Sequence, residues 1–201
     1  MIQDDRYESE THLYRIICLR RSIRQFKPES VTREILTRLV NAARLAPSAA
    51  NLQPLEFIVV DEESLRRKIF PCLKWAAYIS PEGNPRPGHE PTAYVIVLVN
   101  LDIRNKDYER DVGAAVENMI LTGMEEGVGS CWILSSKRDT IRRLLRIPRN
   151  FRIDSVIALG YPGEDPVVEE AKESIKYWKD NKGRLHVPKR KLEDILHFNC
   201  F

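Results

Sequence analysis

Three arginines and a serine lie close enough together to bind an anion. In Arg20-Arg21-Ser22-Ile23-Arg24-Gln25-Phe26, the residues Arg20, Arg21, Ser22 and Arg24 follow a stretch with helical spacing of apolar residues. Guanidinium groups match phosphate oxygens through charge-assisted hydrogen bonds, each contributing roughly 1.5–3 kcal/mol. The run therefore indicates a phosphate site, with a solvated charged helix end as the alternative interpretation.

A second candidate is the stretch Ala46-Pro47-Ser48-Ala49-Ala50-Asn51-Leu52-Gln53-Pro54. Its small residues let a flat ligand approach the backbone, and Ser48, Asn51 and Gln53 can donate and accept hydrogen bonds. An ordinary proline-bounded loop explains the same composition. A third segment, Pro188-Lys189-Arg190, is basic but indicates nothing beyond a charged surface when taken alone.

The motifs of several enzyme classes are missing. The sequence contains no P-loop, GxGxxG, HExxH or GxSxG pattern. The cysteines Cys18, Cys72, Cys131 and Cys200 form no CxxC pair, and no histidine stands at metal-ligand spacing from them. We interpret them as small buried thiols, so neither a hydrolase triad nor a metal site is expected.

Charge and hydropathy limit the partners. The 201 residues carry a formal net charge of only +3, so a general polyanion binder is not indicated. Residues 137–152 are locally basic, but Ile141, Leu144 and Leu145 make this an amphipathic helix with a charged outer face. The aromatic residues that single-strand binders use are nearly absent there, so we expect no nucleic-acid partner.

No segment suggests export or membrane insertion. The longest apolar runs, residues 94–99 and 57–60, are far too short to span a bilayer. The polar N-terminus is unlike a signal peptide. We therefore expect a cytoplasmic protein without a membrane partner, and with 201 residues a single domain over 1–201.

Helices and strands alternate along the chain. Apolar spacing predicts helices over 9–19, from a Thr32 cap to Ala43, over 62–70, over 107–126, and from a Ser136–Asp139 capping box to Leu145. Buried strands are predicted at 55–60, 94–100, 130–134 and 153–159. This alternation predicts a sheet flanked by helices, without fixing whether the strands run parallel.

Two of these segments have distinctive roles. The helix at 107–126 is apolar over a wide arc, so it needs burial on more than one side. Residues 71–92 hold five prolines and two glycines, which predicts a long irregular excursion. Because such excursions are usually functional and this one carries Trp75 and Tyr78, we expect a lid over a substrate pocket.

Taken together, the motifs resemble a known family. RRSIRQF, APSAANLQPLEF, DVGAAVENMILTGMEEGVGSCWI, IALGYPGE and HVPKR, in this order, are similar to the FMN-dependent nitroreductase family over residues 12–197. The resemblance implies an α+β fold with a central, mainly antiparallel sheet flanked by helices. It also implies a homodimer whose interface contains the long helix and binds FMN.

The resemblance further implies roles for individual residues. Arg20 and Ser22 would contact the phosphate and ribityl chain with Arg21 beside them, and Arg24 would approach the N1–C2 carbonyl edge of the flavin. The partner subunit would supply Pro47, Ser48 and Asn51. The segment Cys131, Trp132 and Ile133 would pass near the ring, while Lys189 and Arg190 would complete the phosphate clamp. Leu55 departs from the pattern, because many members have Trp there.

The implied activity is an oxidoreductase that passes hydride from NAD(P)H through FMN to a nitroaromatic, a quinone or a similar small-molecule oxidant by ping-pong turnover. Flavin carries this chemistry, so no residue of the chain is expected to act as a catalytic acid or base. The alternatives are a flavin enzyme of the same fold with another outcome, such as reductive dehalogenation or flavin cleavage, and a non-catalytic FMN-binding module.

Overall fold

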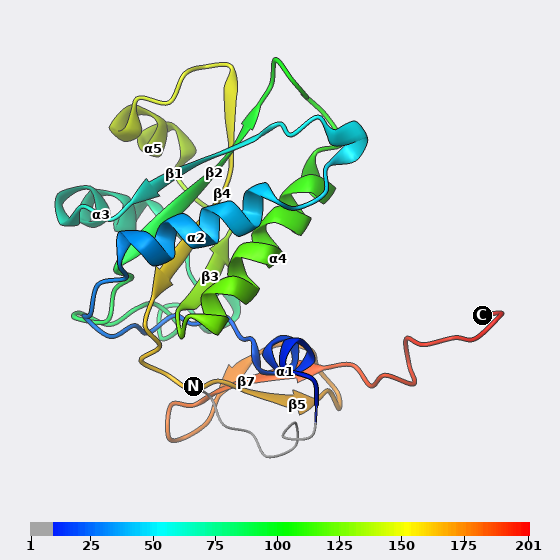
Figure 1. Ribbon diagram of the computed structural model, residues 1–201. Coiled ribbons are helices and arrows are strands. Elements are labelled where there is room, and N and C mark those ends of the chain that lie inside the picture. Colours follow the sequence, from blue (N-terminus) through cyan, green and yellow to red (C-terminus); the bar gives the residue numbers. More distant parts are fainter. Residues whose placement is uncertain (1–9) are drawn as a thin grey trace.

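The computed structural model describes residues 10–201 (Figure 1). Its helices are α1 (His12–Leu19), α2 (Arg33–Arg44), α3 (Glu63–Ile69), α4 (Glu109–Glu125) and α5 (Arg138–Leu145). Short 3-10 turns are η2 (Ala49–Asn51), η3 (Phe70–Cys72) and η4 (Ala77–Ile79). Its strands are β1 (Leu55–Val60), β2 (Ala93–Asn100), β3 (Gly129–Ile133), β4 (Phe151–Gly160), β5 (Val167–Glu170), β6 (Trp178–Lys179) and β7 (Leu185–Lys189).

The central sheet has the order β1-β2-β4-β3, and every neighbouring pair is antiparallel. This confirms the α+β class with an antiparallel sheet. β2 lies in the middle and is buried along nearly its whole length, which explains its unbroken run of apolar residues. Because β4 lies between β2 and β3, the strand order differs from the chain order, and no periodicity in the sequence encodes that order.

Helices cover both faces of the central sheet. Alternate residues of β2 point to opposite faces, so Val95 and Val97 pack toward α2 and α4 while Tyr94 and Ile96 pack toward α3 and α5. Figure 1 shows α2 and α4 crossing the sheet side by side. The long helix α4 buries Val112, Val116, Met119 and Ile120 against this face. Two apolar clusters, one on each face, form the core.

Two helix ends follow the expected local chemistry, and one predicted cap does not form. The Thr32 side chain accepts the Ile35 N–H at 3.3 Å, as the predicted cap requires. Gly127, with φ of 73°, lies just beyond the end of α4, where a left-handed residue is favourable. The predicted Ser136–Asp139 capping box is wrong: Lys137 is the N-cap, and no side chain caps the helix.

The capping box does not form because the chain just before α5 pairs with another segment. Ser136 forms an antiparallel bridge with Leu73, and the Lys137 N–H donates to the Cys72 carbonyl at 2.8 Å. The backbone at Ser136 therefore pairs with the segment around Leu73 and does not cap the helix. The buried Ser136 hydroxyl has no hydrogen-bond partner within residues 10–201.

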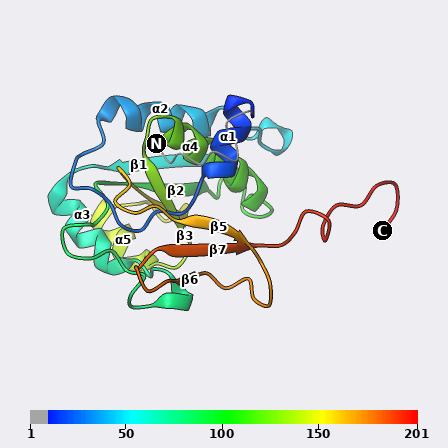
Figure 2. The same ribbon diagram turned by 90° about the horizontal axis from the view of Figure 1, so that it is seen from below.

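The C-terminal region forms a second sheet that the sequence analysis did not predict. Its order is β5-β7-β6, with β5 parallel and β6 antiparallel to β7. His186 on β7 stacks on Trp178 with ring centroids 4.3 Å apart, and its Nδ1 lies 2.9 Å from Glu169. Figure 1 shows β5 and β7 below the central sheet, and Figure 2, seen from below, shows the chain running outward after β7.

The excursion at 71–92 is irregular, as predicted, apart from the turns η3 and η4. It is also anchored to other segments. The Phe26 N–H donates to the His89 carbonyl at 3.0 Å, and the Gln25 side chain donates to the Asn84 carbonyl at 2.9 Å. Among residues 10–201, no helix is long and apolar enough to cross a membrane.

Candidate functional site

Backbone pairing fixes the arginine run beside β3. Ser22 forms a parallel bridge with Ser130, and the Ile23 N–H donates to the Ser130 carbonyl at 2.8 Å. A Cβ at Gly129 would lie only 2.8 Å from Cγ1 of Ile23, so this close approach requires glycine. The pairing holds Arg20 to Arg24 along the edge of the central sheet.

Arg20 and Arg21 lie at the end of α1. The Arg20 Nε is 3.6 Å from a carboxylate oxygen of Glu117 on α4, and both side chains are partly exposed. One Arg21 nitrogen donates to the Arg20 carbonyl at 2.5 Å. A phosphate at Arg20 would therefore compete with a long, solvent-screened ion pair, which is a weak competitor.

Arg24 lies on the other side of the run, against Cys131. Its backbone N–H donates to Glu164 at 2.5 Å, and its guanidinium carbon lies 5.1 Å from the centroid of the Tyr177 ring. The buried Arg24 Nε has no hydrogen-bond partner within residues 10–201. Burial raises the pKa of the Cys131 thiol, and nearby Arg24 opposes that shift only in part, so the thiol stays protonated at neutral pH.

The segment Cys131, Trp132 and Ile133 is part of β3, so its side chains alternate between the two faces. Cys131 and Ile133 join the apolar cluster on the α3 and α5 side, which is also the side of Arg24. Trp132 packs toward α2 and α4, and its buried Nε1 lacks an acceptor within the described chain. Cys131 and Ile133 thus lie on the same face as Arg24, and Trp132 does not.

Hydrogen bonds hold the predicted loop with Pro47, Ser48 and Asn51 in an unusual backbone conformation. The Ser48 hydroxyl accepts the Gln53 N–H at 3.0 Å, and the Ala49 N–H donates to the buried Asp111 at 3.1 Å. Asn51 has a positive φ of 54° without being glycine, a conformation that the surrounding contacts must maintain. Pro47 and Asn51 are exposed.

Within one chain, this loop lies at the first turn of α4, whereas the arginine run extends from the middle of the helix, where Arg20 approaches Glu117, to beyond its far end. Asp111 anchors the loop at the first turn of the helix, whereas Ser22 pairs with Ser130, just beyond the last turn. The 17 residues of α4 span about 25 Å. Figure 1 shows the loop above the upper end of α4 and the arginine run passing below the lower end. The structure does not bring these two predicted parts together in a single chain.

Lys189 ends β7 in the second sheet, Arg190 follows it, and both are exposed. Arg190 donates to the Asp194 carbonyl at 2.8 Å, and the Lys189 carbonyl accepts the Ala171 N–H at 2.7 Å. No hydrogen bond or ion pair between described residues joins this pair to Arg20, Ser22 or Arg24. Their role as a phosphate clamp stays a prediction.

The two predicted pocket residues occupy different environments. Trp75 is only 6% exposed and packs on Phe70 in the apolar core. Tyr78 is 59% exposed and faces Tyr177, with ring centroids 5.0 Å apart. Tyr78 is therefore available to a substrate in this chain, whereas Trp75 supports the fold around it.

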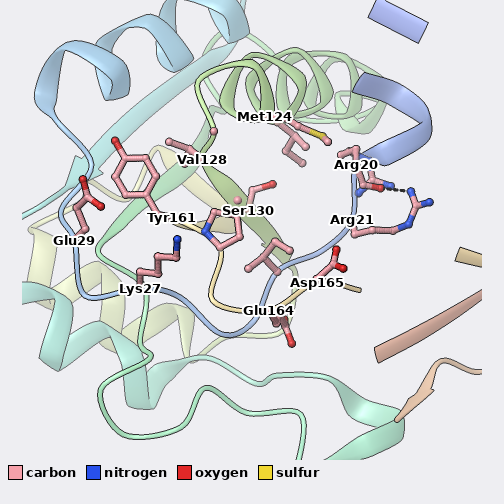
Figure 3. A pocket seen from close by; sticks show the side chains of 15 residues that line it. Arg20, Arg21, Lys27, Glu29, Met124, Val128, Ser130, Tyr161, Glu164 and Asp165 are labelled. Atoms are coloured by element: carbon pink, nitrogen blue, oxygen red, sulfur yellow. Dashed lines mark hydrogen bonds between the residues drawn. The ribbon is translucent and has the colours of Figure 1, made fainter. Parts of the chain in front are cut away.

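A cavity of about 500 Å³ opens beside Arg20 and Arg21 (Figure 3). Its apolar wall includes Met124 and Val128, and Tyr161 lines it from the turn after β4. None of Arg24, Cys131 or Ile133 lines this cavity, so it lies on the α4 side of β3. The sequence analysis missed it, because its lining comes from segments far apart in the chain.

The donor set suits a phosphorylated, electron-accepting ring. Arg20 and Arg24 supply cations, and the unpartnered buried Nε of Arg24 offers a donor to a carbonyl or anion. Within residues 10–201, no group of three or more histidine, cysteine or acidic side chains is placed to hold a metal ion. These residues fit the FMN that the sequence resemblance implies.

Comparison with known proteins gives consistent results. Residues 17–161 match the nitroreductase family. A protein of Archaeoglobus fulgidus, named provisionally as an NADH dehydrogenase/NAD(P)H nitroreductase, is 30% identical over 181 residues, covering 86% of this chain and 95% of its own length. An iodotyrosine dehalogenase 1 homolog of Caenorhabditis elegans is 26% identical, covering 79% of this chain and 57% of its own length.

A solved structure shows the same fold. A nitroreductase-like protein from Desulfovibrio desulfuricans, crystallised with FMN, superposes with a TM-score of 0.68 at 22% identity, covering 96% of this chain and 99% of its own. The family match spans most of the chain, including the arginine run, the loop at 47–51 and β3. The chain therefore belongs to the nitroreductase family and is an oxidoreductase.

Proposed function

We propose that the protein binds FMN at a site shared by two copies of the chain and transfers reducing equivalents from NAD(P)H to a nitroaromatic, a quinone or a similar acceptor. The observation that carries this proposal is the separation of the two predicted half-sites along α4. Within one chain the loop at 47–51 does not contact Ser22, which pairs beyond the far end of α4; in the proposed dimer, a two-fold axis would bring each loop to the other chain's run.

The arginine run and the partner's loop have different roles in the proposed site. Arg20 and Ser22 bind the phosphate and ribityl end, and Lys189 and Arg190 close on the phosphate. Arg24 lies at the N1–C2 edge, where its positive charge stabilises negative charge on the reduced ring. Pro47, Ser48 and Asn51 come from the partner subunit, and Asp111 holds their backbone in place.

When bound, FMN takes a hydride from NAD(P)H and passes two electrons to the acceptor, which takes up its protons from the flavin and solvent. Cys131 stays a neutral thiol near Arg24, because burial raises its pKa. It therefore adds no negative charge that would neutralise Arg24. The buried face around Cys131 and Ile133 limits access of water to that side of the site.

Anaerobic spectroscopy tests this proposal. Purified protein reconstituted with FMN should retain one flavin per chain after gel filtration, and NADH or NADPH should bleach its visible absorption. Adding a quinone should then restore the oxidised spectrum without NAD(P)H present. Retention of flavin without bleaching by either nucleotide would favour a non-catalytic FMN-binding module, and failure to retain FMN would contradict the proposal.

The similarity to the C. elegans dehalogenase homolog favours one second candidate, reductive dehalogenation of an aromatic substrate. The same reduced protein tests it. Release of iodide from an iodophenol at a rate matching flavin reoxidation would support dehalogenation, and reoxidation only by quinones or nitroaromatics would support the first candidate.

A further inference from the structure

Two tyrosines from distant segments meet next to Arg24. Tyr78 lies in the excursion at 71–92 and Tyr177 precedes β6, and their rings are 5.0 Å apart with an interplanar angle of 51°. The Tyr78 N–H donates to the Tyr177 hydroxyl at 3.4 Å. Lys179 donates to the Glu82 carbonyl at 2.9 Å, which ties β6 to the same excursion. The two aromatic side chains are thus held together by backbone and side-chain contacts.

A cation lies over each of these rings. The Arg24 guanidinium carbon is 5.1 Å from the Tyr177 centroid, and the Lys176 ammonium is 5.8 Å from the Tyr78 centroid. Cation–π contacts at exposed sites are weak, so the exposed Lys176 ammonium can leave the Tyr78 ring for a better partner. The result is a small surface of two aromatic rings bordered by two positive charges.

Among residues 10–201, neither cation forms an ion pair, although Glu169, Glu170 and Glu173 line the same hollow as Lys176. Between the described residues, no ion pair includes Arg24 or Lys176, and the buried Arg24 Nε has no acceptor. Glu164, beside Arg24, uses one oxygen to accept the backbone N–H groups of Arg24 and Gln25. Both side-chain cations are therefore available to an anionic group on a ligand.

We infer that Tyr78, Tyr177 and Lys176 form the acceptor subsite and that it favours planar aromatic acceptors bearing a carboxylate or another anionic substituent. The inference rests on the proposed function, because it needs reduced flavin at the Arg24 edge. The aromatic ring of the acceptor packs against the tyrosines, and its anionic substituent takes the Lys176 ammonium from the face of Tyr78. Trp75, which is buried in the core, has no direct part in acceptor choice.

A matched pair of acceptors tests the charge preference. Nitrobenzene and 4-nitrobenzoate share a ring and a nitro group but differ in charge. For the FMN-loaded protein with NADH, the quantity measured is the ratio of kcat/KM for 4-nitrobenzoate to that for nitrobenzene. Lys176→Gln should lower this ratio by about fivefold, which corresponds to one exposed ion pair. Lys176→Arg should preserve most of it.

Lys182→Gln is the matched control. Lys182 is exposed in the turn before β7 and, unlike Lys176, has no cation–π contact with either tyrosine among the described residues. Its loss changes the net charge by the same amount. Tyr177→Leu should raise KM for both acceptors, because it removes one aromatic face. Flavin content and the rate of flavin reduction by NADH are measured in each variant.

The measurements distinguish failure of this inference from failure of the proposed function. If Lys176→Gln lowers the ratio and Lys182→Gln does not, the inference is supported. If the flavin is reduced normally but the two variants give the same ratio, the inference is overturned while the proposed function stands. If NADH and NADPH fail to reduce the flavin of the unmodified protein, the proposed function fails and this inference fails with it.

Discussion

Asp111 holds the loop at 47–51 against the start of α4. One of its carboxylate oxygens accepts the Ala49 N–H at 3.1 Å, and the other lies 3.6 Å from Arg104. Asp111 is only 5% exposed, so the hydrogen bond forms in a poorly solvated environment. A buried carboxylate on the long helix therefore fixes the loop that we propose to serve the partner's flavin.

Replacing Asp111 should weaken both the fold and the loop. Asp111→Ala leaves the Ala49 N–H without its acceptor and removes the ion pair with Arg104, which should cost about 1.5–3 kcal/mol of the free energy of unfolding. Asp111→Asn keeps an acceptor oxygen and should cost less. Urea unfolding measures both variants, with Asp139→Ala on exposed α5 as the control. Equal stability of all three variants would show that the contact does not hold the loop.

Trp75 and Tyr78 should respond differently to truncation. Trp75→Ala empties a buried site and should lower the free energy of unfolding by about 3–5 kcal/mol. Tyr78→Ala removes a side chain that is 59% exposed and should leave stability within about 1 kcal/mol while changing KM for acceptors. Thermal unfolding together with steady-state kinetics separates the two effects. A stable Trp75→Ala protein with altered acceptor choice would contradict this prediction and would support a direct role of Trp75 in the substrate pocket.

Stability should fall at alkaline pH because of Tyr94. Burial raises the pKa of this phenol well above its ordinary value of 10.0. Below about pH 10 the group is protonated in both the folded and unfolded states, so its contribution to stability is fully present. Above that pH the unfolded state ionises first, and stability falls by up to about 1.4 kcal/mol per pH unit until the folded pKa is reached.

Tyr94→Phe tests this linkage. The variant should lose stability less steeply than the unmodified protein between about pH 10 and 11, as measured by urea unfolding at several pH values. Cys131, whose pKa burial also raises, contributes a similar loss from about pH 9 upward in both proteins. Parallel pH profiles for the variant and the unmodified protein would contradict the prediction.

The phosphate clamp predicts selective loss of cofactor affinity. Arg20→Ala and Arg190→Ala should each weaken FMN binding by about tenfold to a hundredfold, the equivalent of one charge-assisted hydrogen bond. Flavin fluorescence titration of the apo variants measures affinity, and circular dichroism shows whether the fold is kept. Arg184→Ala is a control, because that guanidinium is engaged with Asp165. Unchanged affinity in both clamp variants would place the phosphate elsewhere.

The sequence predicted most elements of the central sheet and its helices, since their burial is encoded in local periodicity. It could not predict the order β1-β2-β4-β3, which depends on contacts between distant segments. The second sheet was missed because β6 has only two residues and β5 to β7 are mostly half-buried, so no clear alternation marks them.

The candidate site likewise combines residues that the sequence pointed to with residues that it did not. Arg20, Ser22 and Arg24 form a motif that is visible in the chain, whereas the bridge between Ser22 and Ser130 depends on the fold. Their role in cofactor binding stays a prediction. Asp111 gave no signal, because an acidic residue in the first turn of a helix is common and its burial depends on the distant Ala49. Tyr177 was missed for a similar reason, since only the folded excursion brings Tyr78 to it.

Complementation between two inactive variants tests the shared flavin site most directly. Arg20→Ala and Asn51→Ala should each abolish most NADH-dependent reduction of a quinone. Mixing them after reversible dissociation should produce heterodimers with one intact site, so about a quarter of the unmodified activity should return. No recovery in mixtures that contain heterodimers by mass spectrometry, or full activity of Asn51→Ala alone, would contradict a flavin site built from two copies of this chain.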